Sequence, residues 1–206
     1  MDLFFAPLSC SMAGRIALYE AGIDARFHQV VLSTKRLTTG ESYADINPKG
    51  QVPALKTPDG SILTEGPAVL QFIADSAPAS GLAPPAGSMA RYTLQQWLNY
   101  LSTEVHKAVF YMMFNPASPP EVKAFARDQL LPVRYRFLSE HLKDQAFVLD
   151  RFTVADAYLF TTLNWAGPAG VDLANWPVLE AYRNRLMERP AVARAVGEEL
   201  ALRAAA

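Results

Sequence analysis

A stretch rich in proline, glycine and alanine, residues 77–87, divides the chain into two segments with different hydrophobic patterns. Such a composition favours turns and irregular backbone, so the stretch predicts a linker. With 206 residues, the chain is long enough for one large domain or two small ones. We expect an N-terminal domain over residues 1–80, a linker over 81–87 and a C-terminal domain over 88–206.

The N-terminal segment alternates short apolar runs with helical patterns. Gly22 suits the left-handed position that ends a helix, and Pro58-Asp59-Gly60 is a tight-turn sequence that predicts a hairpin. The order β-α-β, then β-β-α, implies a mixed sheet with a crossover and helices on its faces. The expected strands cover residues 2–5, 27–32, 53–57 and 61–63, and the expected helices cover residues 12–21 and 65–76.

The C-terminal segment shows helical patterns only. About five helices are expected, over residues 89–114, 121–142, 153–165, 177–188 and 191–200. The first is the longest, and helical spacing places one apolar stripe along it: Leu94, Trp97, Leu98, Leu101, Val105, Ala108, Val109 and Met112. The fold class is therefore an α/β domain followed by an all-α domain.

Charge and cysteine content exclude several classes of protein. A net charge of −1 provides no basic field for nucleic acid. The N-terminus has no secretory pattern, and no apolar run approaches the length of a membrane span. Cys10 is the only cysteine, and the histidines at 28, 106 and 141 lack metal-ligand spacing. We expect a cytoplasmic protein without a metal, nucleic acid or membrane partner.

Cys10 follows an expected strand and directly precedes an expected helix. Unpaired backbone N–H groups and the helix dipole favour thiolate over thiol at such a position. Most cysteines without a disulfide are instead small buried hydrophobes. Placement alone leaves both interpretations of Cys10 open.

Three further runs have structural and functional interpretations. A cis Val52-Pro53 bond would turn backbone groups toward an extended peptide, although most X-Pro bonds are trans. Thr64-Glu65-Gly66-Pro67 opens a helix with Thr64 as N-cap, and could also bind an amino-acid head group. Asn99, Thr103 and His106 share one helix face, which is either solvated or part of a cleft.

A fourth run, Thr153-Val154-Ala155-Asp156, predicts a capping box, and we interpret Asp156 as a structural residue.

Together these features resemble the cytosolic glutathione transferases, and more narrowly their bacterial beta class. The Asn-Pro-x-Gly-x-Val-Pro run with a downstream Glu-Gly is typical of the glutathione-binding superfamily, and Cys10 with His106-Lys107 is typical of the beta class. The stretches that carry the resemblance are Phe5-Ala6-Pro7-Leu8-Ser9-Cys10-Ser11, Ile46-Asn47-Pro48-Lys49-Gly50-Gln51-Val52-Pro53-Ala54-Leu55, Leu63-Thr64-Glu65-Gly66, Glu104-Val105-His106-Lys107 and Thr153-Val154-Ala155-Asp156-Ala157-Tyr158.

The resemblance implies a thioredoxin-like first domain, with a four-stranded sheet and three helices, and a homodimer. It also implies roles for individual residues. Cys10 would lie by the glutathione sulfur and form a mixed disulfide with it, and His106 would join it as a catalytic residue. The implied glutathione site comprises Cys10, Lys35 at the glycyl carboxylate, Val52 before a cis Pro53 at the cysteinyl backbone, Glu65 and Gly66 at the γ-glutamyl end, Asn99, Thr103 of the other subunit, Glu104, Val105, His106 and Lys107.

Glutathione would be a co-substrate, with no permanently bound cofactor. Its thiolate would attack small apolar electrophiles beside Leu8, Phe110, Tyr111, Phe114 and Trp165. Ala6 occupies the region where other classes place a catalytic tyrosine, so a tyrosine mechanism is disfavoured. Ser9 and Ser11 flank Cys10, and either could replace it at the sulfur. Two alternatives stay open: monothiol disulfide exchange at Cys10, and a non-catalytic binding protein of the same fold.

Overall fold

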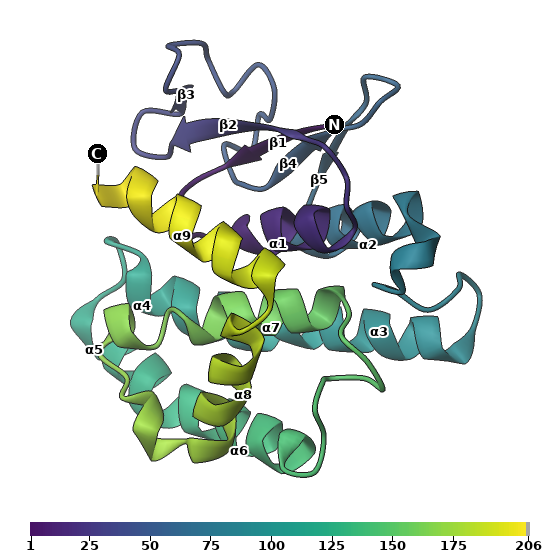
Figure 1. The fold of residues 1–206 in the computed structure, drawn as a ribbon. Helices are drawn as coiled ribbons and strands as arrows, with labels where there is room; N and C mark the ends of the chain where they lie inside the picture. The colour runs from purple at the N-terminus through teal and green to yellow at the C-terminus, as the bar shows by residue number, and fades with distance from the viewer. Residues whose placement is uncertain (205–206) are drawn as a thin grey trace. The chain divides into compact units, whose positions relative to one another are not determined.

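The computed structural model describes residues 1–204 of the chain (Figure 1). Contacts divide them into two compact units: Met1–Ala83 with the residues from Arg189 on, and Pro84–Glu188. The last helix, α9 (Pro190–Ala204), packs against α1 (Met12–Glu20) and so groups with the first unit. From the sequence we expect that helix in the C-terminal domain.

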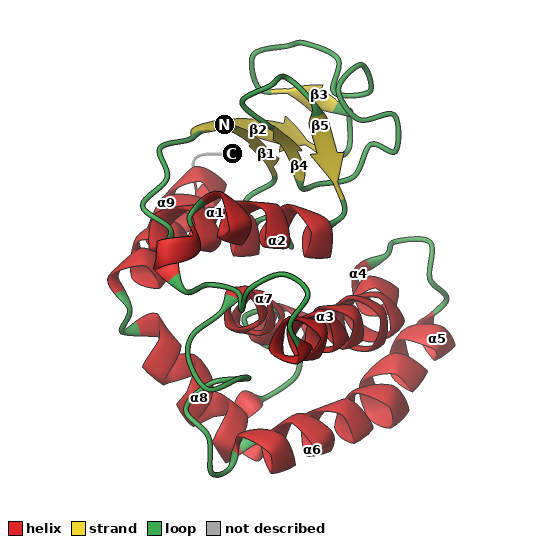
Figure 2. Ribbon diagram, turned by 90° about the vertical axis from the view of Figure 1, so that its right-hand side faces the viewer, coloured by secondary structure: helices red, strands yellow, loops and turns green. Residues whose placement is uncertain are grey.

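A mixed sheet forms the centre of the first unit, in the strand order β3-β2-β1-β4-β5 (Figure 2). β1 pairs with β2 in parallel, and the other neighbouring pairs are antiparallel. The mixed sheet is confirmed, but it has five strands and not four, because a two-residue strand is too short to leave a pattern in the sequence. The strands are β1 (Asp2–Phe5), β2 (Arg26–Val31), β3 (Arg36–Leu37), β4 (Ala54–Lys56) and β5 (Ile62–Thr64).

Two α-helices of this unit lie within residues 1–80, where we expect three. They are α1 and α2 (Gly66–Ser76), followed by a short 3-10 turn, η1 (Pro78–Ser80). Gly22 has a φ of +65°, as expected after a helix end. The third α-helix of the unit is α9, supplied from the other end of the chain.

Side chains of β1 alternate between two cores, because successive residues of a strand point to opposite faces. Leu3 faces α1, where it lies close to Gly14. Phe4 and Ala6 point to the other face, where the loop between β3 and β4 contributes the fully buried Tyr43. The remaining members of this second core are Val30, Leu37, Val52 and Ala54.

The second unit is all helical, as expected. It contains α3 (Met89–Tyr100), the π-helix η2 (Leu101–Tyr111), α4 (Met112–Phe114), α5 (Pro120–Phe125), the π-helix η3 (Ala126–Leu130), α6 (Leu131–Leu142), α7 (Val154–Leu163), the 3-10 turns η4 (Gly167–Ala169) and η5 (Leu173–Asn175), and α8 (Pro177–Met187). The two long helices expected over residues 89–114 and 121–142 therefore each contain π-helical turns.

The π-helix η2 changes which side chains face the core. Its hydrogen bonds run from residue i to i+5, so its turn is wider than that of an α-helix. The buried residues of η2 are Leu101, Val105, Val109 and Phe110. Ala108 is only partly buried and Met112 is exposed, so the expectation that both lie on the buried stripe is wrong.

Asp156 forms the expected capping box at the start of α7. Its carboxylate accepts the Thr153 N–H at 2.8 Å, while the Thr153 hydroxyl accepts the N–H of Ala155 at 3.3 Å. The same buried carboxylate also accepts the Val148 N–H at 2.8 Å and the Tyr182 hydroxyl at 2.6 Å. Asp156 thus joins three segments of the helical unit, which confirms its structural role.

We expect Asp156→Ala to lower the free energy of unfolding by about 3–5 kcal/mol, because several buried donors lose their acceptor. Asp150→Ala is the control, because Asp150 makes an exposed ion pair with Arg151 and should change stability by less than about 0.5 kcal/mol. Urea denaturation of both variants measures the difference. Equal stabilities of the two variants would contradict the structural role of Asp156.

Candidate functional site

Cys10 lies in the loop between β1 and α1, just before the helix begins. Its Sγ is 3.1 Å from the Val52 carbonyl oxygen, to which the thiol donates. The bond between Val52 and Pro53 is cis. The structure therefore brings together two features that are 42 residues apart in the sequence: the cysteine and the Val-Pro run.

The serines beside Cys10 hold the loop in place. Ser11 is fully buried, and its hydroxyl accepts the Ala6 N–H at 3.1 Å and donates to the Ala6 carbonyl at 3.3 Å. The Ser9 hydroxyl lies 2.7 Å from that of Ser11. Both hydroxyls thus stabilise the turn after β1, which leaves Cys10 as the side chain directed at Val52.

A buried carboxylate from α9 holds the same loop. Glu199 is fully buried, and its Oε2 accepts the N–H of Leu8 at 2.6 Å. Leu8 has a φ of +60°, an uncommon conformation for a leucine, so this bond stabilises a turn that the sequence does not favour. Burial raises the pKa of Glu199 to about 7. Sequence analysis missed Glu199, since no local pattern marks it.

Arg15 of α1 provides the opposite charge. Its Nε lies 3.0 Å from Glu199, and its guanidinium carbon lies about 4 Å from the ring centres of Phe5 and Phe27, at 4.2 and 4.1 Å. Glu198, next to Glu199 on α9, accepts from Arg15 at 2.8 Å. α9 is therefore attached to α1 by charged groups on successive residues.

Side chains also bind the backbone just before Val52. Lys35 donates from Nζ to the carbonyl of Gly50 at 2.8 Å, and it has a φ of +54°. The next carbonyl, that of Gln51, accepts from Tyr43 and Asn47, each at 2.7 Å. The backbone of residues 50–51 lies outside every strand, and it is held by contacts with side chains.

Glu65 directly precedes α2 and has a φ of +70°. It is the N-cap residue by position, so the expectation that Thr64 caps this helix is wrong. Lys49 donates to the Glu65 carboxylate at 2.6 Å and to the Thr64 hydroxyl at 2.9 Å. Gly66 begins the helix beside them. Sequence analysis missed Lys49, although it lies in the Asn-Pro-x-Gly run.

His106, on η2, is partly buried in the helical unit. Its Nδ1 lies 2.8 Å from the Tyr158 hydroxyl, and its ring is 4.9 Å from that of Trp165. Burial, and to a lesser extent the charge of Lys107, lowers the pKa of His106 to about 4. The imidazole is therefore neutral at pH 7. When Tyr158 donates to Nδ1, the ring proton resides on Nε2.

Three of the five residues expected beside an electrophile form one aromatic cluster. Phe110 packs edge-on against Trp165 at 5.5 Å and stacks with Phe114 at 6.1 Å. Tyr111 is exposed, with Lys107 over its ring at 4.6 Å. Leu8, the fifth residue, belongs to the first unit, in the Cys10 loop.

The other residues expected at the site have local partners. The Thr103 hydroxyl donates to the Asn99 carbonyl at 3.0 Å, and both side chains are exposed. Glu104 accepts from Arg134 at 2.8 Å. Val105 is buried, so its side chain contributes to the core of the helical unit.

Comparisons with known proteins decide the family. Residues 9–76 match the model of the glutathione S-transferase N-terminal domain, and residues 102–190 match that of the C-terminal domain. Glutathione S-transferase GstA of Escherichia coli O157:H7 is 44% identical over 200 residues, which cover 97% of this chain and 98% of GstA. The chain belongs to the glutathione S-transferase family.

Solved structures of glutathione S-transferases are also similar to this chain. A sphingomonad glutathione S-transferase complexed with glutathione is 42% identical, with a TM-score of 0.93 over 97% of this chain and 98% of the other. The beta-class glutathione S-transferase of Sphingomonas chungbukensis is 39% identical, with the same TM-score and coverage. The resemblance expected from the motifs is confirmed: this protein is a beta-class glutathione transferase.

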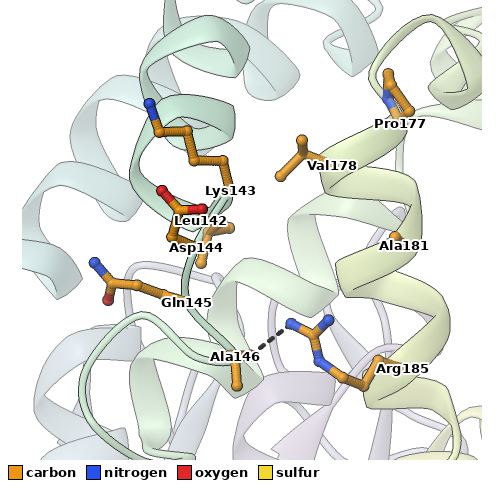
Figure 3. A pocket seen from close by; sticks show the side chains of 9 residues that line it. All are labelled: Leu142, Lys143, Asp144, Gln145, Ala146, Pro177, Val178, Ala181 and Arg185. Carbon is orange, nitrogen blue, oxygen red and sulfur yellow. Dashed lines mark hydrogen bonds between the residues drawn. The ribbon is translucent and has the colours of Figure 1, made fainter.

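The described residues lack two other kinds of feature. No group of three or more His, Cys, Asp or Glu side chains there could hold a metal ion, and no described helix is long and apolar enough to cross a membrane. A hollow of about 570 Å³ lies between the end of α6 and α8 (Figure 3). Arg185 in its lining donates to the Ala146 carbonyl at 2.6 Å. None of the residues expected at the site line this hollow.

The low pKa of His106 has a measurable consequence. Below pH 6.5 an unfolded chain protonates this histidine, whereas the folded transferase does so only near pH 4. Lowering the pH through this window should therefore destabilise the fold, by up to about 2–3 kcal/mol. We expect an NMR titration to show His106 uncharged at pH 5.5. His106→Gln identifies the resonance, and a midpoint near 6.5 would contradict the burial of the ring.

Proposed function

We propose that this transferase binds glutathione along the first unit, with the cysteinyl residue of the tripeptide at Val52 and its sulfur beside Cys10. The contact between Cys10 Sγ and the Val52 carbonyl is the observation that supports this best. A peptide bound by the backbone of Val52 would bring its own side chain next to the Cys10 thiol.

Charges at both ends of this stretch match those of glutathione. On one side, Lys35 Nζ lies at the Gly50 carbonyl and is suited to the glycyl carboxylate. On the other side, the Glu65 carboxylate is suited to the γ-glutamyl ammonium, with Gly66 beside it. Lys49 already pairs with Glu65, so an incoming ammonium would compete with an exposed ion pair, which stabilises by only about 0–1 kcal/mol.

The transfer reaction needs glutathione as a thiolate. The thiolate attacks an electrophilic carbon, the new S–C bond forms, and a group such as halide leaves with its electron pair. We assign His106 a hydrogen bond to the sulfur on the basis of the family resemblance, because a neutral imidazole can donate to a thiolate without requiring its own proton to leave. In the cluster of Phe110, Phe114 and Trp165, Phe114 is the exposed member, and we assign its ring as the apolar surface for the electrophile, with the buried Phe110 and Trp165 behind it.

The remaining assignments are also proposals. By resemblance we assign a homodimer in the cytoplasm, with Asn99, Glu104, Val105 and Lys107 near glutathione and Thr103 reaching the site of the other subunit. Glutathione acts as co-substrate, without a permanently bound cofactor. The non-catalytic alternative is not favoured, because the similar proteins are transferases.

Thiol–disulfide exchange is a second activity, favoured by the position of Cys10. A Cys10 thiolate would attack one sulfur of oxidised glutathione, form the mixed disulfide and release the other glutathione as a thiolate. A turnover assay with an aryl halide and one with a small glutathionylated disulfide distinguish transfer from exchange.

Glutathione binding tests the first assignment. We expect Glu65→Gln to weaken binding about ten- to hundredfold in calorimetry, because a charge-assisted hydrogen bond is lost. Glu140→Gln is a matched control, since Glu140 is equally exposed and also pairs with a lysine. The control should bind as the wild type does. If millimolar glutathione gives no binding to the wild type, the proposed function is wrong.

Cys10 chemistry tests the second assignment. Incubation with oxidised glutathione at neutral pH should add one glutathione to the intact protein, as measured by mass spectrometry. Cys10→Ala should show no addition, because no other cysteine exists in the chain. A wild-type protein that stays unmodified while glutathione is bound would contradict the placement of the sulfur beside Cys10.

A further inference from the structure

Two buried side chains hold one carbonyl oxygen in the glutathione-binding stretch. Tyr43 is fully buried, and its hydroxyl donates to the Gln51 carbonyl at 2.7 Å. Asn47, also buried, donates from Nδ2 to the same oxygen at 2.7 Å. A carbonyl oxygen has two lone pairs, so both are used. The direction of this carbonyl is therefore fixed from inside the protein.

The fixed carbonyl determines the direction of the next N–H. The Gln51 C=O and the Val52 N–H belong to one planar peptide group, and in a trans peptide they point in opposite directions. The cis bond lies one peptide further on, between Val52 and Pro53. Holding the Gln51 oxygen therefore holds the Val52 N–H on the opposite side.

The Val52 N–H is available to a ligand. Within the part of the chain that the structure describes, it donates to no protein group. The Val52 carbonyl is already engaged by Cys10. The Val52 N–H is therefore a backbone donor without a protein acceptor, and it lies on the residue that contacts the Cys10 thiol.

Tyr43 is placed where its hydroxyl can act as a rigid hydrogen-bond donor. The tyrosine belongs to the core on the second face of the sheet, with Phe4 and Ala54 among its members. Burial raises the pKa of Tyr43 to about 12, so the hydroxyl keeps its proton at physiological pH. Asn47 is held as well, because its Oδ1 accepts the Lys49 N–H at 3.2 Å.

We propose that Tyr43 is a positioning residue for glutathione: through the Gln51–Val52 peptide group it directs the Val52 N–H toward the cysteinyl carbonyl of the tripeptide. Asn47 acts in the same way on the same oxygen. This inference rests on the proposed function, since it requires that glutathione binds at Val52.

Two variants test the proposal, and each of them loses only the hydroxyl group of one tyrosine. Tyr43→Phe removes the donor to Gln51 and keeps the ring in the core. Tyr135→Phe is the matched control, because Tyr135 is equally buried and its hydroxyl has no hydrogen-bond partner among the described residues. We expect Tyr43→Phe to raise the Kd of glutathione about three- to tenfold. Tyr135→Phe should leave the Kd unchanged.

Two further measurements separate positioning from general loosening. In the free protein, the NMR amide resonance of Val52 should shift in Tyr43→Phe and stay in place in Tyr135→Phe. With an aryl halide as the second substrate, Tyr43→Phe should raise the KM for glutathione more than it lowers kcat. Asn47→Asp keeps the acceptor for Lys49 but removes the Nδ2 donor, and it should show the same pattern.

The outcomes are distinct. A wild-type protein that does not bind glutathione means that the proposed function has failed. A wild-type protein that binds, with a Tyr43→Phe variant of equal Kd and an unmoved Val52 resonance, overturns the positioning role alone. An equal rise of Kd in Tyr43→Phe and Tyr135→Phe also overturns it, because loss of any buried hydroxyl would then have the same effect.

Discussion

The hydrogen bond between the Cys10 thiol and the Val52 carbonyl depends on the order of strands in the sheet. β1 and β4 are antiparallel neighbours, with Phe4 opposite Ala54. The loop that leaves β1 and the segment that enters β4 therefore lie side by side, at the same end of these two strands. The first carries the Cys10 thiol, and the second carries the backbone of Val52. The proximity of the Cys10 thiol to Val52 is thus a consequence of strand pairing, and the surrounding side chains only adjust it.

Two titratable side chains, one in each unit, are affected by burial. Burial acts in opposite directions on them: it raises the pKa of Glu199 to about 7 and lowers that of His106 to about 4. In both cases burial disfavours the charged form. Arg15 lies against the Glu199 carboxylate, whereas His106 has an uncharged phenol beside it. One unit thus contains a buried carboxyl group beside an arginine, and the other contains a neutral histidine beside a tyrosine.

Sequence analysis succeeded where a feature depends on neighbouring residues. The capping box at Asp156 and the helix end at Gly22 are local, so a few residues determine each of them. For the candidate site, the motifs identify Cys10, Val52 and Glu65, but they do not identify the groups that hold these residues in place. Tyr43 and Glu199 act through tertiary contacts that leave no periodic pattern. The π-helix η2 was missed for a related reason: its apolar spacing closely resembles that of an α-helix.

The contact between Glu199 and Leu8 joins residues that are 191 positions apart. During synthesis the N-terminal strands and helices leave the ribosome first, and domains generally begin to fold in that order. The loop that carries Cys10 nevertheless lacks its buried carboxylate until the whole helical unit has been translated. A nascent chain that stops before α9 can therefore form the sheet while its thiol loop still lacks the native support. In this transferase the Cys10 loop is therefore among the first segments to be made and among the last to gain all of its native contacts.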